Sequence, residues 1–142
     1  MKRYIVKILL ITLSFILIDP TLIAQELKSR EAQKLLIKIE EGLNNGSVDK
    51  FSNYFDERCY ISLSSNISGY YSANQSYYVI KDYFSVFKPI SFNFTFSSTD
   101  TENPFAAGNL KFKNKGIRGN AIVFVTLHYV SNKWLISQIT IN

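Results

Sequence analysis

Residues 90–96 read Ile-Ser-Phe-Asn-Phe-Thr-Phe, with an apolar side chain at every second position. This alternation is typical of a β-strand that buries one face and leaves the other to solvent. The same alternation returns at Leu110 and Phe112, which lie among lysines, and Asn114-Lys115-Gly116 then supplies a hairpin turn. We therefore predict two neighbouring antiparallel strands in this part of the chain.

Two more strands are predicted after this turn. Residues 117–130 form one long strand, and its centre, residues 121–125, is apolar on both sides. Ser131-Asn132 is a second turn sequence, and residues 134–141 form the final strand. Because consecutive strands joined by tight turns pair antiparallel, the second half of the chain is predicted to be a meander.

The chain before the meander begins with helices. Residues 26–43 carry apolar side chains at helical spacing on one face, with Lys and Glu on the other face. The sequence Asn44-Asn45-Gly46 ends this helix, and Ser47 is predicted to cap a second, shorter helix that directs Phe51 and Phe55 inward.

A strand and a third helix complete the first half. Residues 59–63 alternate like a strand, and residues 64–69 form a polar break. Ser72, with Gln75 three residues later, has the capping-box pattern, and apolar residues at helical spacing follow until Lys88-Pro89. The third helix is therefore predicted to end just before the first strand of the meander.

This order of elements predicts one α+β domain over residues 25–142. A curved, mainly antiparallel sheet has to cover its apolar face, and the three N-terminal helices are available to do so. We expect a cone with the helices on the concave side of the sheet, either filled by core side chains or left with a cavity where the two layers fail to meet. No repeat or low-complexity tract divides the sequence.

Residues 1–24 are predicted to be a signal peptide rather than part of the domain. Lys2, Arg3 and Lys7 give a positive start, and the apolar run that follows is shorter than the roughly 20 residues that a bilayer span needs. Ala24 suits the position before a cleavage point. We expect an exported protein, periplasmic or secreted, with no stable membrane span after cleavage; the alternative is an uncleaved N-terminal anchor.

Removal of this segment lowers the net charge. The full chain has 16 basic and 11 acidic residues, and the part after Ala24 keeps 13 and 10, a net charge of +3. This is too small to indicate nucleic acid as a partner. Basic residues at positions 111, 113, 115 and 118 gather around one hairpin; we interpret them as a solvated strand face, with an anionic polymer or lipid headgroups as the alternative.

The sequence offers little metal or cofactor chemistry. A single cysteine, Cys59, and a single histidine, His128, exclude an internal disulfide and a His/Cys zinc cage. Cys59 alternates with Ile61 and Leu63 and is predicted to be a buried core residue. There is no phosphate-binding glycine loop, HExxH motif or nucleophile elbow, so we predict no cofactor and no metal.

Short motifs along the chain resemble those of one protein family. They comprise Asn44-Asn45-Gly46-Ser47, Tyr54-Phe55, Gly69-Tyr70-Tyr71-Ser72-Ala73-Asn74-Gln75, Tyr83-Phe84, Pro89-Ile90-Ser91-Phe92, Gly108-Asn109-Leu110 and Ile136-Ser137-Gln138-Ile139-Thr140-Ile141. In order and spacing they are similar to the DUF4783 family, an NTF2-like group of exported bacterial proteins chiefly from Bacteroidetes. The resemblance implies the NTF2-like cone and an exported location, and it carries over no catalytic residue.

Aromatic residues are the most unusual feature, with 9 Tyr, 11 Phe and 1 Trp. They form either an aromatic-walled pocket, in which Tyr hydroxyls orient a flat ligand, or simply the core between a helix and a strand. The core interpretation is favoured for the periodic residues and is weaker for the tyrosines that precede the third helix. The residues predicted to line a cavity are Tyr70, Tyr71, Tyr77, Phe84, Phe94, Phe112, Phe124 and His128.

Three functional hypotheses follow. The preferred one is a non-catalytic binding module that holds a small apolar ligand in the cone or contacts a protein partner. The second is an isomerase or hydratase that uses a Tyr with His128 or a carboxylate; His128 shares a strand side with Ile122 and Phe124 and is expected to face the interior, whereas Asp82 is predicted to be solvated. The third is a structural homodimer formed through the outer sheet face.

Overall fold

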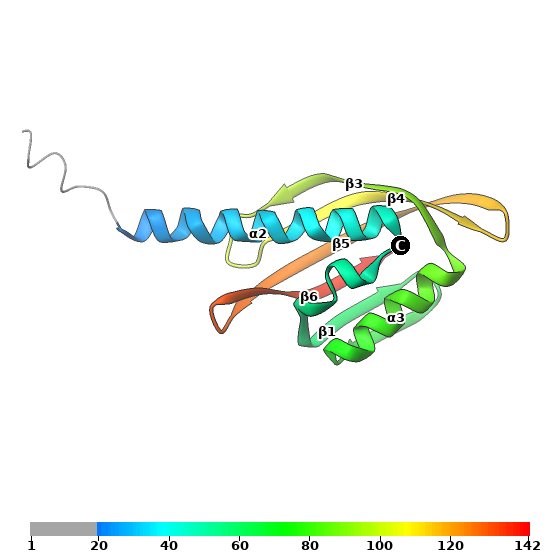
Figure 1. Ribbon diagram of the computed structural model, residues 1–142, viewed down its shortest axis with the longest axis horizontal. Helices are drawn as coiled ribbons and strands as arrows, with labels where there is room; N and C mark the ends of the chain where they lie inside the picture. The colour runs from blue at the N-terminus through cyan, green and yellow to red at the C-terminus, as the bar shows by residue number, and fades with distance from the viewer. Residues whose placement is uncertain (1–19) are drawn as a thin grey trace, which may run out of the picture.

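The computed structural model describes residues 20–142, which form one long helix, one shorter helix and a curved sheet (Figure 1). The helices are α2 (Pro20–Asn45) and α3 (Ala73–Val86), with the short 3₁₀ turns η1 (Val48–Lys50) and η2 (Ser52–Tyr54) between them. The strands are β1 (Phe55–Leu63), β2 (Ile67–Tyr71), β3 (Lys88–Ser98), β4 (Phe105–Asn114), β5 (Ile117–Val130) and β6 (Lys133–Ile141). The α+β prediction is confirmed.

The six strands form a single mixed sheet in the order β2-β1-β6-β5-β4-β3. The strands β3 to β6 pair as the predicted antiparallel meander. The strands β1 and β2 form an antiparallel hairpin, and β1 joins the meander by pairing parallel to β6. Since only this one pairing is parallel, the sheet is mainly antiparallel, as the sequence predicts.

The helix α2 lies along the sheet and packs mainly against β3 (Figure 1). Its buried residues include Leu35, Ile39 and Leu43, the apolar face that the sequence predicts. Two polar residues fix its C-terminal half. A carboxylate oxygen of Glu40 accepts a hydrogen bond from the Phe94 backbone N–H at 3.0 Å, and the Asn44 side-chain oxygen accepts one from the Phe92 N–H at 2.8 Å.

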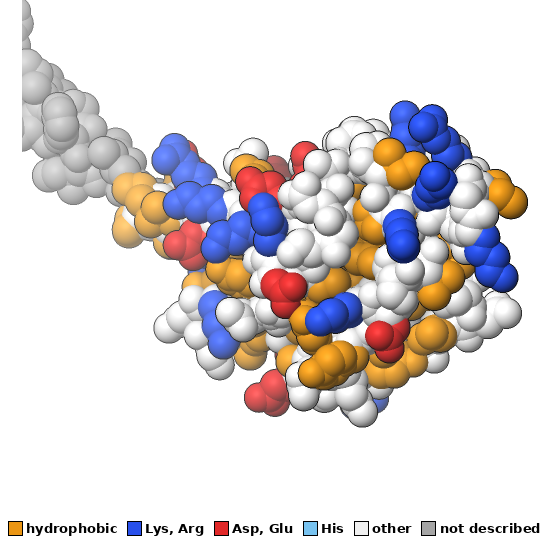
Figure 2. Space-filling view, turned by 45° about the vertical axis from the view of Figure 1, so that its right-hand side comes forward, with side chains coloured by type: hydrophobic (Ala, Val, Ile, Leu, Met, Phe, Trp, Pro, Cys, Tyr) orange, Lys and Arg blue, Asp and Glu red, His pale blue; other side chains and the backbone are white. Residues whose placement is uncertain are grey.

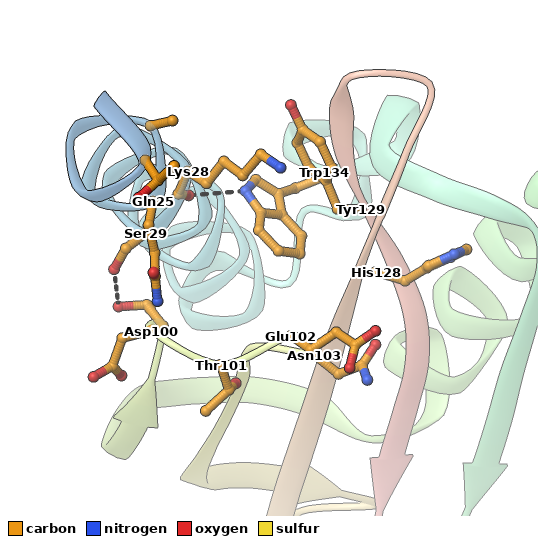
Figure 3. Close-up of a pocket in the computed structure, with 13 residues that line it drawn as sticks. Gln25, Lys28, Ser29, Asp100, Thr101, Glu102, Asn103, His128, Tyr129 and Trp134 are labelled. Atoms are coloured by element: carbon orange, nitrogen blue, oxygen red, sulfur yellow. Dashed lines mark hydrogen bonds between the residues drawn. The ribbon is translucent and has the colours of Figure 1, made fainter. Parts of the chain in front are cut away.

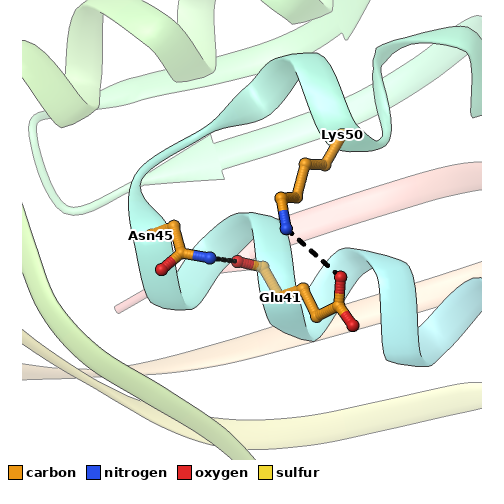
Figure 4. A network of polar contacts seen from close by, with 3 residues as sticks. All are labelled: Glu41, Asn45 and Lys50. Atoms are coloured by element: carbon orange, nitrogen blue, oxygen red, sulfur yellow. Dashed lines mark hydrogen bonds and ion pairs between the residues drawn. The ribbon is translucent and has the colours of Figure 1, made fainter.

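The second predicted helix is replaced by η1 and η2, and the Ser47 side chain makes no capping hydrogen bond. The chain turns sharply at Gly46, which adopts a φ of 64°. Next to this turn Lys50 Nζ lies 3.2 Å from Oε2 of Glu41, and Asn45 Nδ2 donates to the Glu41 carbonyl oxygen at 2.9 Å (Figure 4). Phe51, which is fully buried, anchors the turn to the core. Two helices plus these turns therefore cover the sheet, instead of three helices.

The helix α3 begins where the capping box predicts. The Ser72 Oγ atom accepts a hydrogen bond from the Gln75 backbone N–H at 3.3 Å, and Gln75 Oε1 accepts one from the Ser72 N–H at 3.0 Å. The buried side of α3 includes Ile80 and Phe84 and packs chiefly against β1. Asp82 lies on the exposed side, as predicted.

The predicted polar break at residues 64–69 contains a strand. The chain reverses at Asn66, which adopts a φ of 64°, and Ile67–Tyr71 then pairs with β1 as the edge strand β2. Tyr70 and Tyr71 therefore lie in a strand and not in a loop before α3. Asn is one of the few residues that adopt this left-handed conformation readily, which explains the tight reversal.

The space between the helices and the sheet is filled with side chains. One continuous cluster of buried residues joins Leu36 of α2, Ile80 of α3 and strand residues such as Leu110, Val123 and Ile139. In the described part of the chain, the cone is therefore filled by core residues, the interpretation favoured for the periodic aromatic residues. Open depressions lie at one end of the fold and on the outer face of the sheet.

The predicted signal peptide falls largely on residues 1–19, which lie outside the described residues. Its last residues, Pro20–Ala24, form the first turn of α2 and are exposed. Within residues 20–142, neither helix has the length and apolarity needed to cross a membrane.

Candidate functional site

A hollow of about 760 Å³ opens at the end of the fold where α2 starts and the β5–β6 hairpin turns (Figure 3). We call it the mouth hollow. Its walls come from α2, from the loop between β3 and β4, and from the β5–β6 hairpin. The lining residues are Thr21, Ala24, Gln25, Lys28, Ser29, Thr99, Asp100, Thr101, Glu102, Asn103, His128, Tyr129 and Trp134.

Two aromatic rings form the inner wall of the mouth hollow. The ring centroids of Tyr129 and Trp134 are 4.8 Å apart with an interplanar angle of 59°. The indole Nε1–H of Trp134 donates to the Lys28 carbonyl oxygen at 2.9 Å, and Lys28 Nζ lies 4.4 Å from the centre of the Tyr129 ring. The helix therefore fixes both rings, and their remaining surface faces the opening (Figure 3).

The β5–β6 hairpin puts both rings on this side of the sheet. Ser131 and Asn132 adopt φ values of 50° and 61°, which suits a tight hairpin loop with the twist of the flanking strands. Tyr129 and Trp134 are directly paired across the hairpin. Because paired residues share a sheet face, both rings face α2.

Polar groups form the opposite rim. The loop after β3 is fixed to α2 by the hydrogen bond between Ser29 Oγ and Thr99 Oγ1, at 2.9 Å. Asp100 and Glu102 follow in this loop, and both are exposed. The mouth hollow therefore combines an aromatic wall with a rim that carries two carboxylates, an arrangement that suits a planar ligand with a hydrogen-bond donor or a positive charge.

A second, shallower depression of about 710 Å³ lies on the outer face of the sheet; we call it the outer groove. Its lining residues are Asp56, Glu57, Arg58, Tyr60, Tyr70, His128, Ser137 and Gln138. Within it, the Arg58 guanidinium lies 4.6 Å from the centre of the Tyr70 ring, and Tyr60 contacts that ring edge-on at 5.2 Å. These contacts fix the orientation of the Tyr70 ring.

His128 lies at the border of the two depressions. Its Nδ1 atom is 2.7 Å from Oδ2 of Asp56, and its imidazole is directed away from Tyr129 and Trp134 (Figure 3). The sequence prediction that His128 shares a strand side with Ile122 and Phe124 is correct, but this is the outer side. The core side of β5 is formed by Ala121, Val123, Val125 and Leu127.

The eight residues predicted to line one cavity are distributed over the molecule. Phe84 is buried in the core; Tyr71, Tyr77, Phe94 and Phe112 pack against it from the side. Tyr70 and Phe124 are exposed on the outer face, and of the eight only His128 borders the mouth hollow. Within residues 20–142, the predicted residues are therefore not brought together in one pocket.

Sequence reasoning did not single out Tyr129, Trp134 or Asp56. Tyr129 and Trp134 flank the Ser131-Asn132 turn symmetrically, so the hairpin prediction already contained the signal that the two rings pair. Asp56 gave no such signal because its partner His128 lies two strands away, across β6.

Cys59 is buried and unpaired, as predicted. Burial raises the pKa of its thiol to about 12. The Ser76 hydroxyl lowers this pKa by a smaller amount, and the Asp56 carboxylate raises it further. A thiol with this pKa is not a nucleophile at neutral pH. In the described residues no group of three or more His, Cys, Asp and Glu side chains could hold a metal ion.

The helices on one face of a curved sheet define the NTF2-like α+β class, and solved structures share this fold. They include an NTF2-like protein of unknown function from Shewanella oneidensis, 12% identical, with a TM-score of 0.57 over 79% of this chain and 96% of that chain. A DUF4783 protein from Bacteroides ovatus is 24% identical, with a TM-score of 0.65 over 73% of this chain and 90% of that chain. One from Bacteroides uniformis is 24% identical, with a TM-score of 0.67 over 74% and 93%.

The family model described as "Domain of unknown function (DUF4783)" matches residues 36–142. The chain belongs to the DUF4783 family, as its motifs predict. No curated protein matches its sequence.

Proposed function

We propose that this protein is a non-catalytic binding module and that its ligand site is the mouth hollow. The observation that carries the proposal is the Tyr129–Trp134 pair, two large rings fixed by α2 beside an opening of about 760 Å³. The interior of the cone is filled by core residues, so a ligand would lie at its open end. The proposed ligand therefore lies at the open end of the cone and not inside it, and its expected contact with aromatic rings is kept.

The chemistry of the walls narrows the ligand class. The two rings, inclined at 59° to each other, offer apolar surface, and the rim offers the carboxylates of Asp100 and Glu102. Among the lining residues within 20–142, Lys28 is the one lysine or arginine, and its ammonium group already lies over Tyr129. A small planar molecule with an amino group therefore fits better than a purely apolar ligand or an anion.

Acid–base catalysis receives less support from the geometry. The Nδ1 atom of His128 is engaged with Asp56, and the imidazole is directed away from the mouth hollow (Figure 3). In the outer groove the Tyr60 hydroxyl is hydrogen-bonded to Ser68 Oγ at 2.8 Å. Such chemistry needs a base and a donor that converge on one reacting atom. The Asp56 contact leaves Nε2 of His128 available as a base, but the Tyr60 hydroxyl of the same groove is bonded to Ser68 and is not directed at it.

The single tryptophan provides the test, because Trp134 lines the proposed site and its fluorescence reports on it directly. We expect benzylamine, an aromatic amine without an indole, to change the Trp134 emission saturably and benzoate, an anionic counterpart, to do so much more weakly. The Tyr129→Ala and Glu102→Gln variants should weaken the benzylamine response, whereas the matched Tyr70→Ala variant in the outer groove should not. Equal titrations of Tyr129→Ala and the original chain would contradict the proposal.

We further propose that residues 1–24 are a signal peptide and that the protein acts after export. The first turn of α2 is exposed. Cleavage after Ala24 would remove two lining residues of the mouth hollow, Thr21 and Ala24. It would leave both aromatic rings and both carboxylates in place. The intact mass of protein isolated from its host should correspond to a chain that starts at Gln25. An intact mass that includes residues 1–24 would contradict this proposal.

A homodimer through the outer sheet face is the second candidate function. On this face Phe96, Ala107 and Phe124 are direct cross-strand neighbours, and the Phe105 ring lies 5.6 Å from that of Phe96. Phe96 is 56% exposed and Phe124 is 42% exposed. Contiguous exposed rings of this kind mark interaction surfaces more often than free surface.

Light scattering combined with size exclusion tests this second candidate. A dimer is expected for the original chain, and the Phe124→Ser variant should elute as a monomer. The Ile37→Ser variant, which removes an exposed apolar residue from α2 instead, should remain dimeric. A monomeric original chain would exclude this candidate and leave the ligand proposal intact.

A further inference from the structure

Basic residues meet without acidic partners at the end of the molecule opposite the mouth hollow. Lys88 on β3 pairs directly with Lys113 on β4, and Lys113 pairs directly with Arg118 on β5. Three adjacent strands therefore present one row of like charges, and Lys111 and Lys115 lie close by in the same hairpin. We call this group, together with Ile117, the basic tip.

This row is unfavourable for the fold itself. Like charges that are directly opposed on neighbouring strands destabilise the pair. Among residues 20–142 none of the five basic residues of the tip takes part in an ion pair. The sequence offers no compensation along the strands either, because residues 103–142 contain no Asp or Glu. The positive potential at this end is therefore uncompensated and available to an external anion.

An exposed apolar residue stands at the end of the tip. The loop Lys115-Gly116 turns the chain with φ values of 48° and 86°, and Ile117 follows directly. Ile117 is 75% exposed, the highest value among the exposed large hydrophobic residues of the described chain. In Figure 1 this hairpin extends beyond the helices, and in Figure 2 basic side chains gather at this end, with apolar side chains between them.

We propose that the basic tip docks the protein on an anionic lipid bilayer. The tip would meet the bilayer end-on, because Ile117 and Arg118 are consecutive strand residues that face opposite sides of the sheet. The lysines and Arg118 would lie at the level of the headgroup phosphates, each contributing electrostatic attraction, while Ile117 enters the interfacial region. Charge alone would also suit an anionic polymer, but a polymer in water gives no reason for so exposed an apolar side chain among the basic residues. The combination of uncompensated charge and an exposed isoleucine favours the bilayer.

Co-sedimentation with lipid vesicles tests the proposal. The chain should pellet with vesicles that contain phosphatidylglycerol and remain in solution with pure phosphatidylcholine, and added salt should release it. The double variant Lys113→Glu, Arg118→Glu should bind at least about 10-fold more weakly, since each basic residue near the surface contributes several-fold in affinity. Lys133→Glu at the opposite hairpin is the matched control and should bind like the original chain.

The Ile117→Ser variant separates the bilayer from a polymer. It keeps every charge, so binding to heparin should be unchanged, whereas binding to phosphatidylglycerol vesicles should weaken. Circular dichroism establishes that each variant is folded, and the N-terminal segment is common to all of them. Vesicle binding that is unaffected by the double variant, or by Ile117→Ser, would overturn the proposal.

Discussion

The Nδ1 atom of His128 lies 2.7 Å from Oδ2 of Asp56, although the two residues belong to β5 and β1 and β6 runs between them. Irregular pairing brings them together. The β1–β6 register shifts between Phe55 and Tyr60, and the β5–β6 register shifts between Thr126 and Leu127. Bulges of this kind redirect side chains, here across the strand that separates Asp56 from His128.

A double-mutant cycle measures what this contact contributes. The His128 side chain is 44% exposed and that of Asp56 is 17% exposed, so solvent screens the interaction. We expect His128→Gln, Asp56→Asn and the double variant to give a coupling free energy of about 1 kcal/mol or less. Urea unfolding at neutral pH provides the measurement; a coupling several times larger would show that the pair fixes the bulged strands.

Alkaline pH should destabilise the fold through Cys59. The unfolded thiol releases its proton near its ordinary pKa of 9.0, whereas the buried thiol keeps it up to a pKa of about 12. The unfolded chain therefore binds fewer protons in this interval, and the free energy of unfolding falls as the pH rises from 9.0 towards 12. The Cys59→Ala variant should show a shallower fall in denaturant titrations, and an unchanged slope would contradict the assignment.

Gly108 should be intolerant of a side chain. A Cβ atom at this position would meet the backbone carbonyl oxygen of Asn93 and would lie 2.8 Å from Cζ of Phe92. Because a backbone atom cannot rotate away, Gly108→Ala should lower the free energy of unfolding by about 1–3 kcal/mol.

Gly69→Ala is the matched control, since its Cβ would have only ordinary contacts at 3.8 Å with the Tyr71 ring. Thermal unfolding of both variants gives the comparison. Similar losses of stability in the two variants would mean that the close approach of β3 and β4 at Gly108 is not the cause.

The capping box at the start of α3 should make a measurable contribution to the free energy of unfolding. Ser72→Ala removes the acceptor for the Gln75 N–H and should lower the free energy of unfolding by about 1 kcal/mol. Ser72→Asp retains an acceptor and should be close to the original chain. Denaturant unfolding curves measure both, and equal losses would show that the cap contributes nothing.

The sequence predicts those helices and strands that are determined by a local residue pattern. The meander and α3 follow from alternation, turn residues and the capping box. The strand β2 was missed because Ile67–Tyr71 is an edge strand with exposed residues on both faces, so it shows no clear alternation. The second helix was predicted wrongly because the inward spacing of Phe51 and Phe55 is also compatible with two short turns.

The candidate site was less predictable for a different reason. Ile122, Phe124, Val123 and Val125 are all apolar, so the sequence of β5 does not reveal which side faces the core. The wrong choice moves His128 from the outer face to the interior, since successive strand residues face opposite sides. The aromatic wall depends on where α2 meets a distant hairpin, which no local pattern contains.

The position of β6 has a consequence for how the chain assembles. This strand of 9 residues comes last among the strands of residues 20–142, yet it lies between β1 and β5 and, within these residues, is the only strand that links the two halves of the sheet. A chain that emerges from its N-terminus can form the β1–β2 hairpin early, but it cannot join that hairpin to the meander before Lys133–Ile141 has been synthesised. Completion of the sheet is thus a late, non-local step of high contact order, which has to wait until the other five described strands have been synthesised.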